Sequence, residues 1–214
     1  MPDTDPFARL EETVRRKSQE EKAHKILQTV LIRLFTGKDA KSPFFATLGL
    51  RMKSYPDWEC ETACTNGSEL RYNPDFVVEQ DTPRAMGLMA HEIMHNDQKH
   101  IARRGARDPS RWNEATDCEI NPLLRDAGFE LPDGGIFPGE GEHKDLPKDA
   151  NAEKYYDLLP DRKGGDGDGP QDCGGCGAVE DAGDKAQQAQ AAAEMDIAVV
   201  QAAEAAKARG ELPG

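Results

Sequence analysis

The chain has 214 residues, of which 37% are hydrophobic and 31% are charged, and its formal net charge is −13. This length allows one domain, or one domain with extensions. The strong negative charge argues against nucleic acid or an anionic membrane surface as the main partner. Five cysteines are an odd number in a chain that lacks the composition of a small disulfide scaffold, so we expect reduced thiols.

The N-terminal residues do not resemble a targeting segment. Residues 1–5 are acidic and are not followed by the apolar core of a signal peptide. No stretch approaches the roughly 18 apolar residues of a membrane span. We therefore expect a cytoplasmic protein that does not bind membranes.

The first third of the chain favours one long helix followed by strands. Apolar residues recur at helical spacing up to Phe35, and Gly37 is a plausible helix end. Further on, Asn66-Gly67 is a strong turn signal between two strands. The predicted elements are a helix over 7–36 and strands over 44–52, 58–65 and 69–72.

Two helices are predicted in the middle of the chain. The first covers residues 83–103, with Thr82 as its N-cap and Pro83 at its first position. The second is capped by Ser110, is kinked or interrupted at Pro122 and ends at Gly128.

The last third divides by composition. Residues 131–149 are rich in glycine, proline and charge and are expected to form a loop, and residues 151–159 favour a short helix. Glycine and aspartate then mark a flexible linker, and alanine marks a terminal helix. The predicted organisation is a domain over 1–160, a linker over 161–178 and an Ala-rich helical segment over 179–214.

The helix predicted over 83–103 carries the motif His91-Glu-Ile-Met-His95. Histidines four residues apart lie on one face of a helix, so two imidazole nitrogens can bind one zinc ion. The adjacent Glu92 can act as general base on a zinc-activated water. The alternative is an ordinary core helix whose histidines are hydrogen-bonded.

A catalytic zinc usually needs a third protein ligand, and three residues are candidates. His100 would turn away from His95 if the helix continued, so it could bind the zinc ion only if the helix ended first. The other option for His100 is a hydrogen-bonding role. Glu114 and Asp117 share the next predicted helix. Spacing alone does not choose between these two acids.

Three motifs together resemble a known family. They are Arg71-Tyr-Asn-Pro-Asp-Phe-Val77, then His91-Glu-Ile-Met-His95 with His100, then Trp112-Asn-x-Ala-x-Asp-x-x-Ile-Asn121. In this order they resemble a family of predicted metal-dependent peptidases whose domain often precedes a von Willebrand factor A-like domain. The resemblance covers roughly residues 7–160. It implies that Asp117 is the third ligand, with Glu114 in reserve.

Two further features carry hypotheses about binding. Tyr72 and Asn73 precede the motif helix at what we expect to be a strand edge, where zincin-type enzymes bind the substrate backbone, although an ordinary edge explains them equally well. Cys173 and Cys176 have the spacing of half a zinc knuckle, but two thiols in a flexible linker are the simpler interpretation.

These features favour an α+β, zincin-like domain with a small mixed sheet packed on helices. The leading hypothesis is a zinc-dependent hydrolase, a metallopeptidase acting on a peptide or protein. The alternative is a non-catalytic zinc-binding module whose C-terminal helix binds a protein partner, and a third is a fold that binds no metal.

Overall fold

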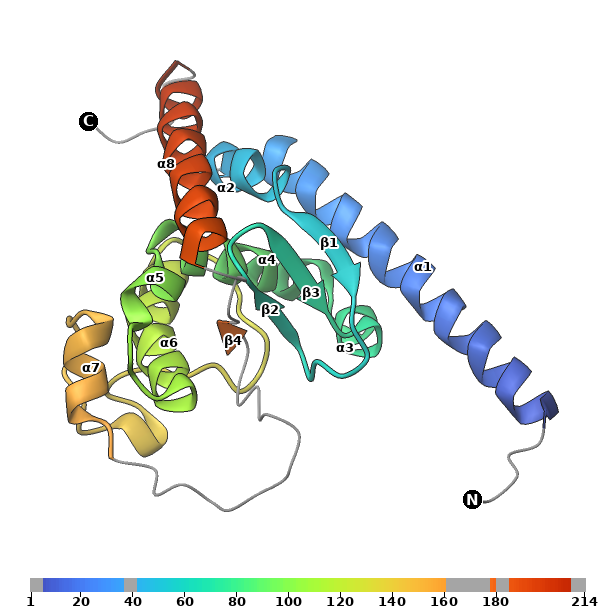
Figure 1. The fold of residues 1–214 in the computed structure, drawn as a ribbon, viewed down its shortest axis with the longest axis horizontal. Helices are drawn as coiled ribbons and strands as arrows, with labels where there is room; N and C mark the ends of the chain where they lie inside the picture. Colours follow the sequence, from blue (N-terminus) through green and yellow to red (C-terminus); the bar gives the residue numbers. More distant parts are fainter. Residues whose placement is uncertain (1–5, 37–41, 161–177, 180–184, 209–214) are drawn as a thin grey trace.

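In the part of the chain that the structure describes, helices dominate and four short strands form a single sheet (Figure 1). The computed structural model describes residues 6–36, 42–160, 178–179 and 185–208. The α+β class expected from the sequence is confirmed. The helices are α1 (Pro6–Thr36), α2 (Ser42–Gly49), α3 (Pro74–Glu79), α4 (Thr82–Asp97), α5 (His100–Arg104), α6 (Pro109–Asp126), α7 (Ala152–Leu158) and α8 (Lys185–Ala208), with a 3-10 turn at Gly141–His143. The strands are β1 (Lys53–Pro56), β2 (Ala63–Thr65), β3 (Glu69–Tyr72) and β4 (Ala178–Val179).

The sheet is mixed, with the strand order β1-β3-β2-β4. The central pair, β2 and β3, is antiparallel and joined through the Asn66-Gly67 turn, where Gly67 adopts a φ of 100°. β1 pairs with β3 in parallel, and β4 pairs with β2 in parallel. β2 packs on α4, which places one face of the sheet against the helix that carries the metal motif.

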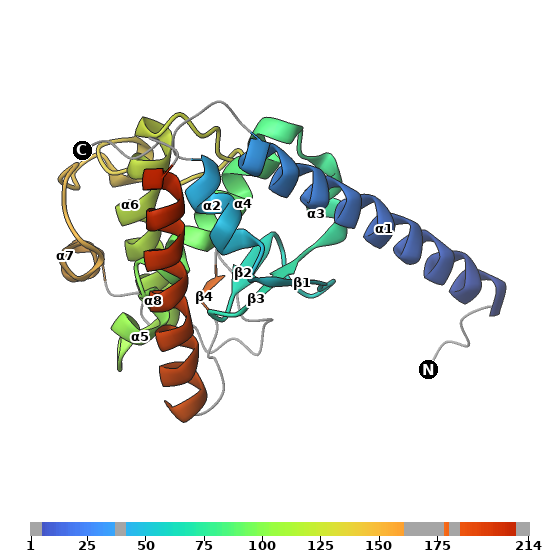
Figure 2. The same cartoon turned by 90° about the horizontal axis from the view of Figure 1, so that it is seen from above.

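The long helix α1 is buried only in its second half. Ala23, Leu27, Val30 and Leu34 recur every three or four residues and lie in the main core. Apolar residues near its start are exposed, including Phe7 at 75%. The first turns of α1 therefore extend away from the body of the protein, as Figures 1 and 2 both show, whereas Arg15 and Gln19 already contact Asp75 of α3.

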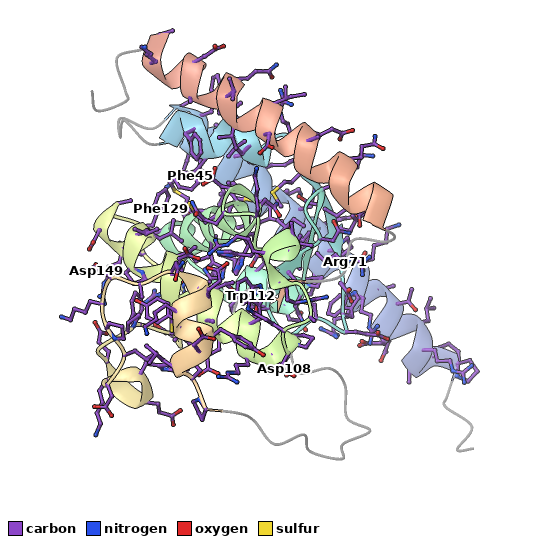
Figure 3. All side chains as sticks on the ribbon, turned by 60° about the vertical axis from the view of Figure 1, so that its left-hand side comes forward. Phe45, Arg71, Asp108, Trp112, Phe129 and Asp149 are labelled. Carbon is purple, nitrogen blue, oxygen red and sulfur yellow. The ribbon has the colours of Figure 1, made fainter. Side chains whose placement is uncertain are left out.

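The strand predicted over residues 44–52 is wrong, because this segment forms α2 and the turn that follows it. A short, continuous apolar run fits a buried helix as well as a strand. Packing decides the case here: Phe45, Ala46 and Leu48 are buried in the main core, and the Phe45 ring meets Phe129 edge-on with centroids 4.9 Å apart (Figure 3).

The neighbouring strand predictions are partly right. The strand expected over 58–65 is reduced to β2, whereas β3 has the predicted bounds. Two elements were missed, β1 and the short helix α3, which Asn73 caps by accepting hydrogen bonds from two backbone amides. A four-residue strand and a six-residue helix are too short to show a clear period.

The helix predicted over 83–103 is in fact two helices. α4 ends at Asp97, and Lys99 adopts a left-handed backbone with φ 57° before α5 begins at His100. The predicted caps are each displaced by one or two residues. Asp81 rather than Thr82 caps α4, and Asp108 rather than Ser110 caps α6.

Helix α6 runs through Pro122 without ending and joins two separate cores. One face places Ile120 and Leu124 in the main core with α4. The opposite face places Ala115 and Cys118 against Tyr155 of α7. The short helix predicted over 151–159 is confirmed as α7, capped by Asn151.

A glycine allows the chain after α6 to lie directly on α4. A Cβ atom on Gly87 would lie 1.9 Å from the carbonyl oxygen of Glu130. No side chain fits in that space. Gly87 therefore brings the segment that follows Gly128 against the helix that carries the metal motif.

The alanine-rich terminal helix packs on the body of the protein. α8 lies along α2 and also contacts α4, and its Ala202 is fully buried in the main core. β4 includes the expected start of this helix. Gly37, the 161–177 part of the predicted linker, and Cys173 and Cys176 lie outside the described residues. Across the described ranges, no helix is both long and apolar enough to cross a bilayer.

Candidate metal centre

Three side chains from two helices converge on one point. His91 and His95 are one turn apart on α4, and Asp117 comes from α6. The Nε2 atoms of the two histidines are 2.9 Å apart. Oδ1 of Asp117 lies 3.5 Å from Nε2 of His91 and 3.4 Å from Nε2 of His95. Ligand atoms about 2.0–2.1 Å from one zinc ion in tetrahedral geometry are separated by about 3.3 Å, so the triangle has the size that a metal ion requires.

A hydrogen bond from α6 fixes the tautomer of His91. Its Nδ1 lies 2.9 Å from Oδ1 of Asn121, and Nδ2 of the same amide donates to the carbonyl of Ile136 at 3.0 Å. The amide therefore presents its oxygen to the ring, and Nδ1 of His91 must carry the proton. Nε2 of neutral His91 is left with a lone pair facing the site.

A second histidine fixes the tautomer of His95 in the same way. Nε2 of His100 lies 3.0 Å from Oε2 of Glu119, which accepts its proton, and Nδ1 of His100 lies 2.9 Å from Nδ1 of His95. Burial lowers the pKa of His100, so its ring is neutral and its Nδ1 accepts. Nδ1 of His95 is then the donor, and its Nε2 also offers a lone pair.

The site thus brings three electron pairs together where they repel one another. Oδ1 of Asp117 is buried and accepts no hydrogen bond among the described residues. Burial raises the pKa of this carboxyl well above its usual range, with the charges of Glu92 and Glu114 adding to the effect. A buried cation would offset all of these costs, so the donor set fits a divalent metal ion, and two nitrogens with one oxygen suit zinc.

The break between α4 and α5 explains how His100 reaches His95. The left-handed residue Lys99 turns the chain back, and the indole of Trp112 donates to the carbonyl of His100 at 2.9 Å. His100 is completely buried but is not one of the three converging groups. It contacts His95 instead, which is the hydrogen-bonding arrangement considered for it.

A charged network continues from His100 toward the surface. Glu119 also forms an ion pair with Arg103, with 3.1 Å between the guanidinium nitrogen and the carboxylate oxygen. Arg103 forms a second ion pair with Glu153 of α7 at 2.7 Å. Arg103 and His100 lower the pKa of the Glu119 carboxyl against the effect of burial. Glu119 is therefore an anion that holds His100 in the tautomer required by His95.

The other two acidic candidates have different positions. Glu92 is completely buried next to His91, and its charge acts on Asp117. Glu114 lies on α6 one turn before Asp117, but its Oε1 binds Nε2 of His143 at 2.6 Å. Glu114 and His143 line a cleft of about 490 Å³, which is formed mainly by residues 134–143. Glu114 is thus engaged outside the group formed by the two histidines and Asp117.

Tyr72 and Asn73 do not lie at a sheet edge, so that expectation is wrong. β3 is paired on both sides, and Tyr72 is 2% exposed. Asn73 caps α3 and donates to the carbonyl of Cys60. Their contact with a substrate stays a prediction without the exposed edge on which it depended.

Sequence reasoning assigned no role to Asn121, Glu119 or Arg103. The one available signal was spacing, since Asn113, Asp117 and Asn121 recur every four residues and so share a face of α6. Arg103 and Glu119 come from separate helices and meet only in the folded chain.

The comparisons with known proteins agree with this geometry. A family model described as "Putative metallopeptidase domain" matches residues 31–214. No curated protein and no solved structure matches the chain. The match covers most of the sequence and includes all three converging side chains, and the chain therefore belongs to this metallopeptidase-domain family.

Proposed function

We propose that the protein is a zinc-dependent peptidase with a zincin-like site in which His91, His95 and Asp117 hold the metal. The observation that carries this proposal is the convergence of the Nε2 atoms of His91 and His95 and an unsatisfied carboxylate oxygen of Asp117 within 3.5 Å of one another. Such a group is unstable without a cation and is arranged to bind one.

Glu92 is the proposed general base. A zinc ion, when bound, supplies a Lewis acid that polarises a carbonyl and acidifies water. Glu92 follows His91 directly and is buried, so its carboxylate lies beside the proposed metal, within the protein rather than in solvent. It takes a proton from the attacking water and returns it to the leaving amine, which makes the overall reaction hydrolysis of a peptide bond.

Substrate access is the main requirement that the geometry places on this function. The three ligand residues are at most 2% exposed. Leu131, Pro132 and Gly135 bound the small space beside His91, and Gly135 also lines the larger cleft. A peptide bound in the cleft reaches the metal when the segment over residues 131–136 moves aside.

The burial of the ligands also favours a second function, a metal-binding scaffold without catalysis. In that case zinc would join α4 to α6, and α8 would contact a protein partner. Glu92 argues for catalysis, because a site that only joins helices has no use for a buried carboxylate beside the metal.

Metal content tests the site. We expect about one equivalent of zinc in the purified wild type by mass spectrometry, and a loss or sharp reduction in His95→Ala and Asp117→Ala. Glu114→Ala is the matched control on α6 and should retain zinc. Wild-type protein without metal, even after reconstitution, would contradict the proposal.

Activity and chelation separate catalysis from scaffolding. Glu92→Gln should retain zinc and lose cleavage of a peptide library by at least about 100-fold. The chelated wild type should remain folded by circular dichroism but lose its activity. Peptide cleavage that survives Glu92→Gln would contradict the proposed mechanism. Unfolding of the protein on chelation would support the metal-binding scaffold.

A further inference from the structure

Asn113 is a buried amide whose hydrogen-bonding groups have no partner among the described residues. The residue is 6% exposed, and neither its Nδ2 nor its Oδ1 makes a hydrogen bond. Buried amides are nearly always hydrogen-bonded, because an unpaired donor or acceptor is costly in an apolar environment. A side chain with both groups unpaired is therefore a candidate for contact with a ligand.

Asn113 lies on the same face of α6 as Asp117, one of the three residues of the candidate metal centre. It lies four residues before Asp117, and this spacing turns it only about 40° from Asp117 around the helix. Ile120 and Leu124 share this face and pack in the core with α4. The residues that contact α7, Ala115 and Cys118, lie on the opposite face.

The chemistry of the side chain limits what it can bind. A primary amide offers an N–H donor and a carbonyl acceptor side by side. A peptide group offers the complementary pair, a carbonyl oxygen and an N–H. A phosphate or carboxylate would satisfy the donor alone and leave Oδ1 facing negative charge.

We propose that Asn113 is a substrate-binding residue of the metal centre, with Nδ2 donating to a carbonyl of the substrate backbone and Oδ1 accepting an N–H. The inference deepens the proposed peptidase function and rests on it. It makes the substrate a peptide amide recognised through its main chain. Because the contact forms only with substrate, the folded protein carries the cost of the unpaired amide.

The first test compares stability in matched variants. Asn96 is equally buried, but its amide exchanges hydrogen bonds with Thr65 at 3.1–3.2 Å. Asn96→Ala should therefore lower the melting temperature. Asn113→Ala should leave the melting temperature unchanged or raise it, and it should retain one equivalent of zinc. A fall in Asn113→Ala equal to that in Asn96→Ala overturns the inference, because it shows a structural amide.

The second test measures binding without hydrolysis. Zinc-loaded Glu92→Gln protein is titrated with a mixture of hexapeptides that are blocked at both ends and randomised in their side chains. We expect the mixture to raise the melting temperature, and Asn113→Ala in the same background to weaken the apparent affinity at least tenfold. An unchanged affinity, or no binding by the protein that retains Asn113, overturns the inference.

The two proposals can fail separately. If peptides bind through Asn113 but the zinc-loaded wild type cleaves none of them, the peptidase function fails and the binding residue stands. If the wild type cleaves the peptides and Asn113→Ala cleaves them with the same kcat/KM, the binding residue fails and the function stands.

Discussion

Single hydrogen bonds position the side chains of the candidate metal centre. The sequence predicted His91, His95 and Asp117 through two motifs, and the structure brings the three together. It could not predict that Asn121 and His100 would set the protonation of the two rings, because those contacts depend on how α6 and α5 pack against α4.

Asn121 offers the first expectation at this scale. Asn121→Ala removes the acceptor that holds His91 in its metal-binding tautomer, and such contacts are typically worth 10–100-fold in metal affinity. We expect zinc binding to weaken by this amount in a competition with a fluorescent chelator. Asn151→Ala, which removes the cap of α7, should lower stability instead. Equal zinc affinity in wild type and Asn121→Ala would contradict the assigned role.

The pH dependence of zinc binding follows from Asp117. Burial and the neighbouring carboxylates raise its pKa in the metal-free protein. Because zinc needs the ionised carboxylate, a raised pKa means that protons compete with zinc at a higher pH than for an ordinary aspartate. The zinc dissociation constant should rise as pH falls, about tenfold per pH unit below that pKa. Asp117→Asn should bind zinc weakly with a flatter pH profile.

At the scale of elements, the strongest patterns predicted structure well and short segments did not. The amphipathic second half of α1 and the capped helix α7 were both expected, because each has a clear period or cap. α2 was mistaken for a strand, since its apolar run has no period. The end of α4 was missed because no glycine or proline marks it, and the left-handed turn uses Lys99 instead.

Gly87 carries the expectation at this scale. Gly87→Ala places a methyl carbon 1.9 Å from the carbonyl oxygen of Glu130, and neither atom can move unless the backbone that holds it moves. The two segments must separate, at a cost of about 3 kcal/mol or more. We expect a lower midpoint in urea unfolding. Arg84→Ala, on the exposed side of α4, should cost less than about 1 kcal/mol. Equal midpoints for wild type and Gly87→Ala would refute this close approach.

At the scale of the whole molecule, the main core and the candidate metal centre are built largely from different residues. The core joins α1, α2, α4 and α6 with the sheet and includes Ala202 of α8. The sequence identified α8 as a helix but gave no sign that it packs on the body, because alanine marks helical propensity and says little about which face is buried.

Ala202 tests this separation. Ala202→Glu places a charge at a completely buried position, which should detach α8 and lower the melting temperature by several degrees. Zinc content should stay near one equivalent, because the ligands lie on α4 and α6. Glu204→Ala, at an exposed position of the same helix, serves as the control. Loss of zinc together with α8 would show that the two are coupled.

The near-complete burial of the three ligand side chains also has a kinetic consequence. A metal ion held by three side chains of 0–2% exposure could not leave by simple dissociation, so its release would wait for a local opening of the structure. The carbonyl of Ile136 is tied to His91 through Asn121. If the segment that contains Ile136 moves away, it therefore loosens the hydrogen bond that holds His91 and at the same time opens a path to the metal. The rate of exchange between bound and free isotopes of zinc would then report how often the protein opens, independently of chelator concentration.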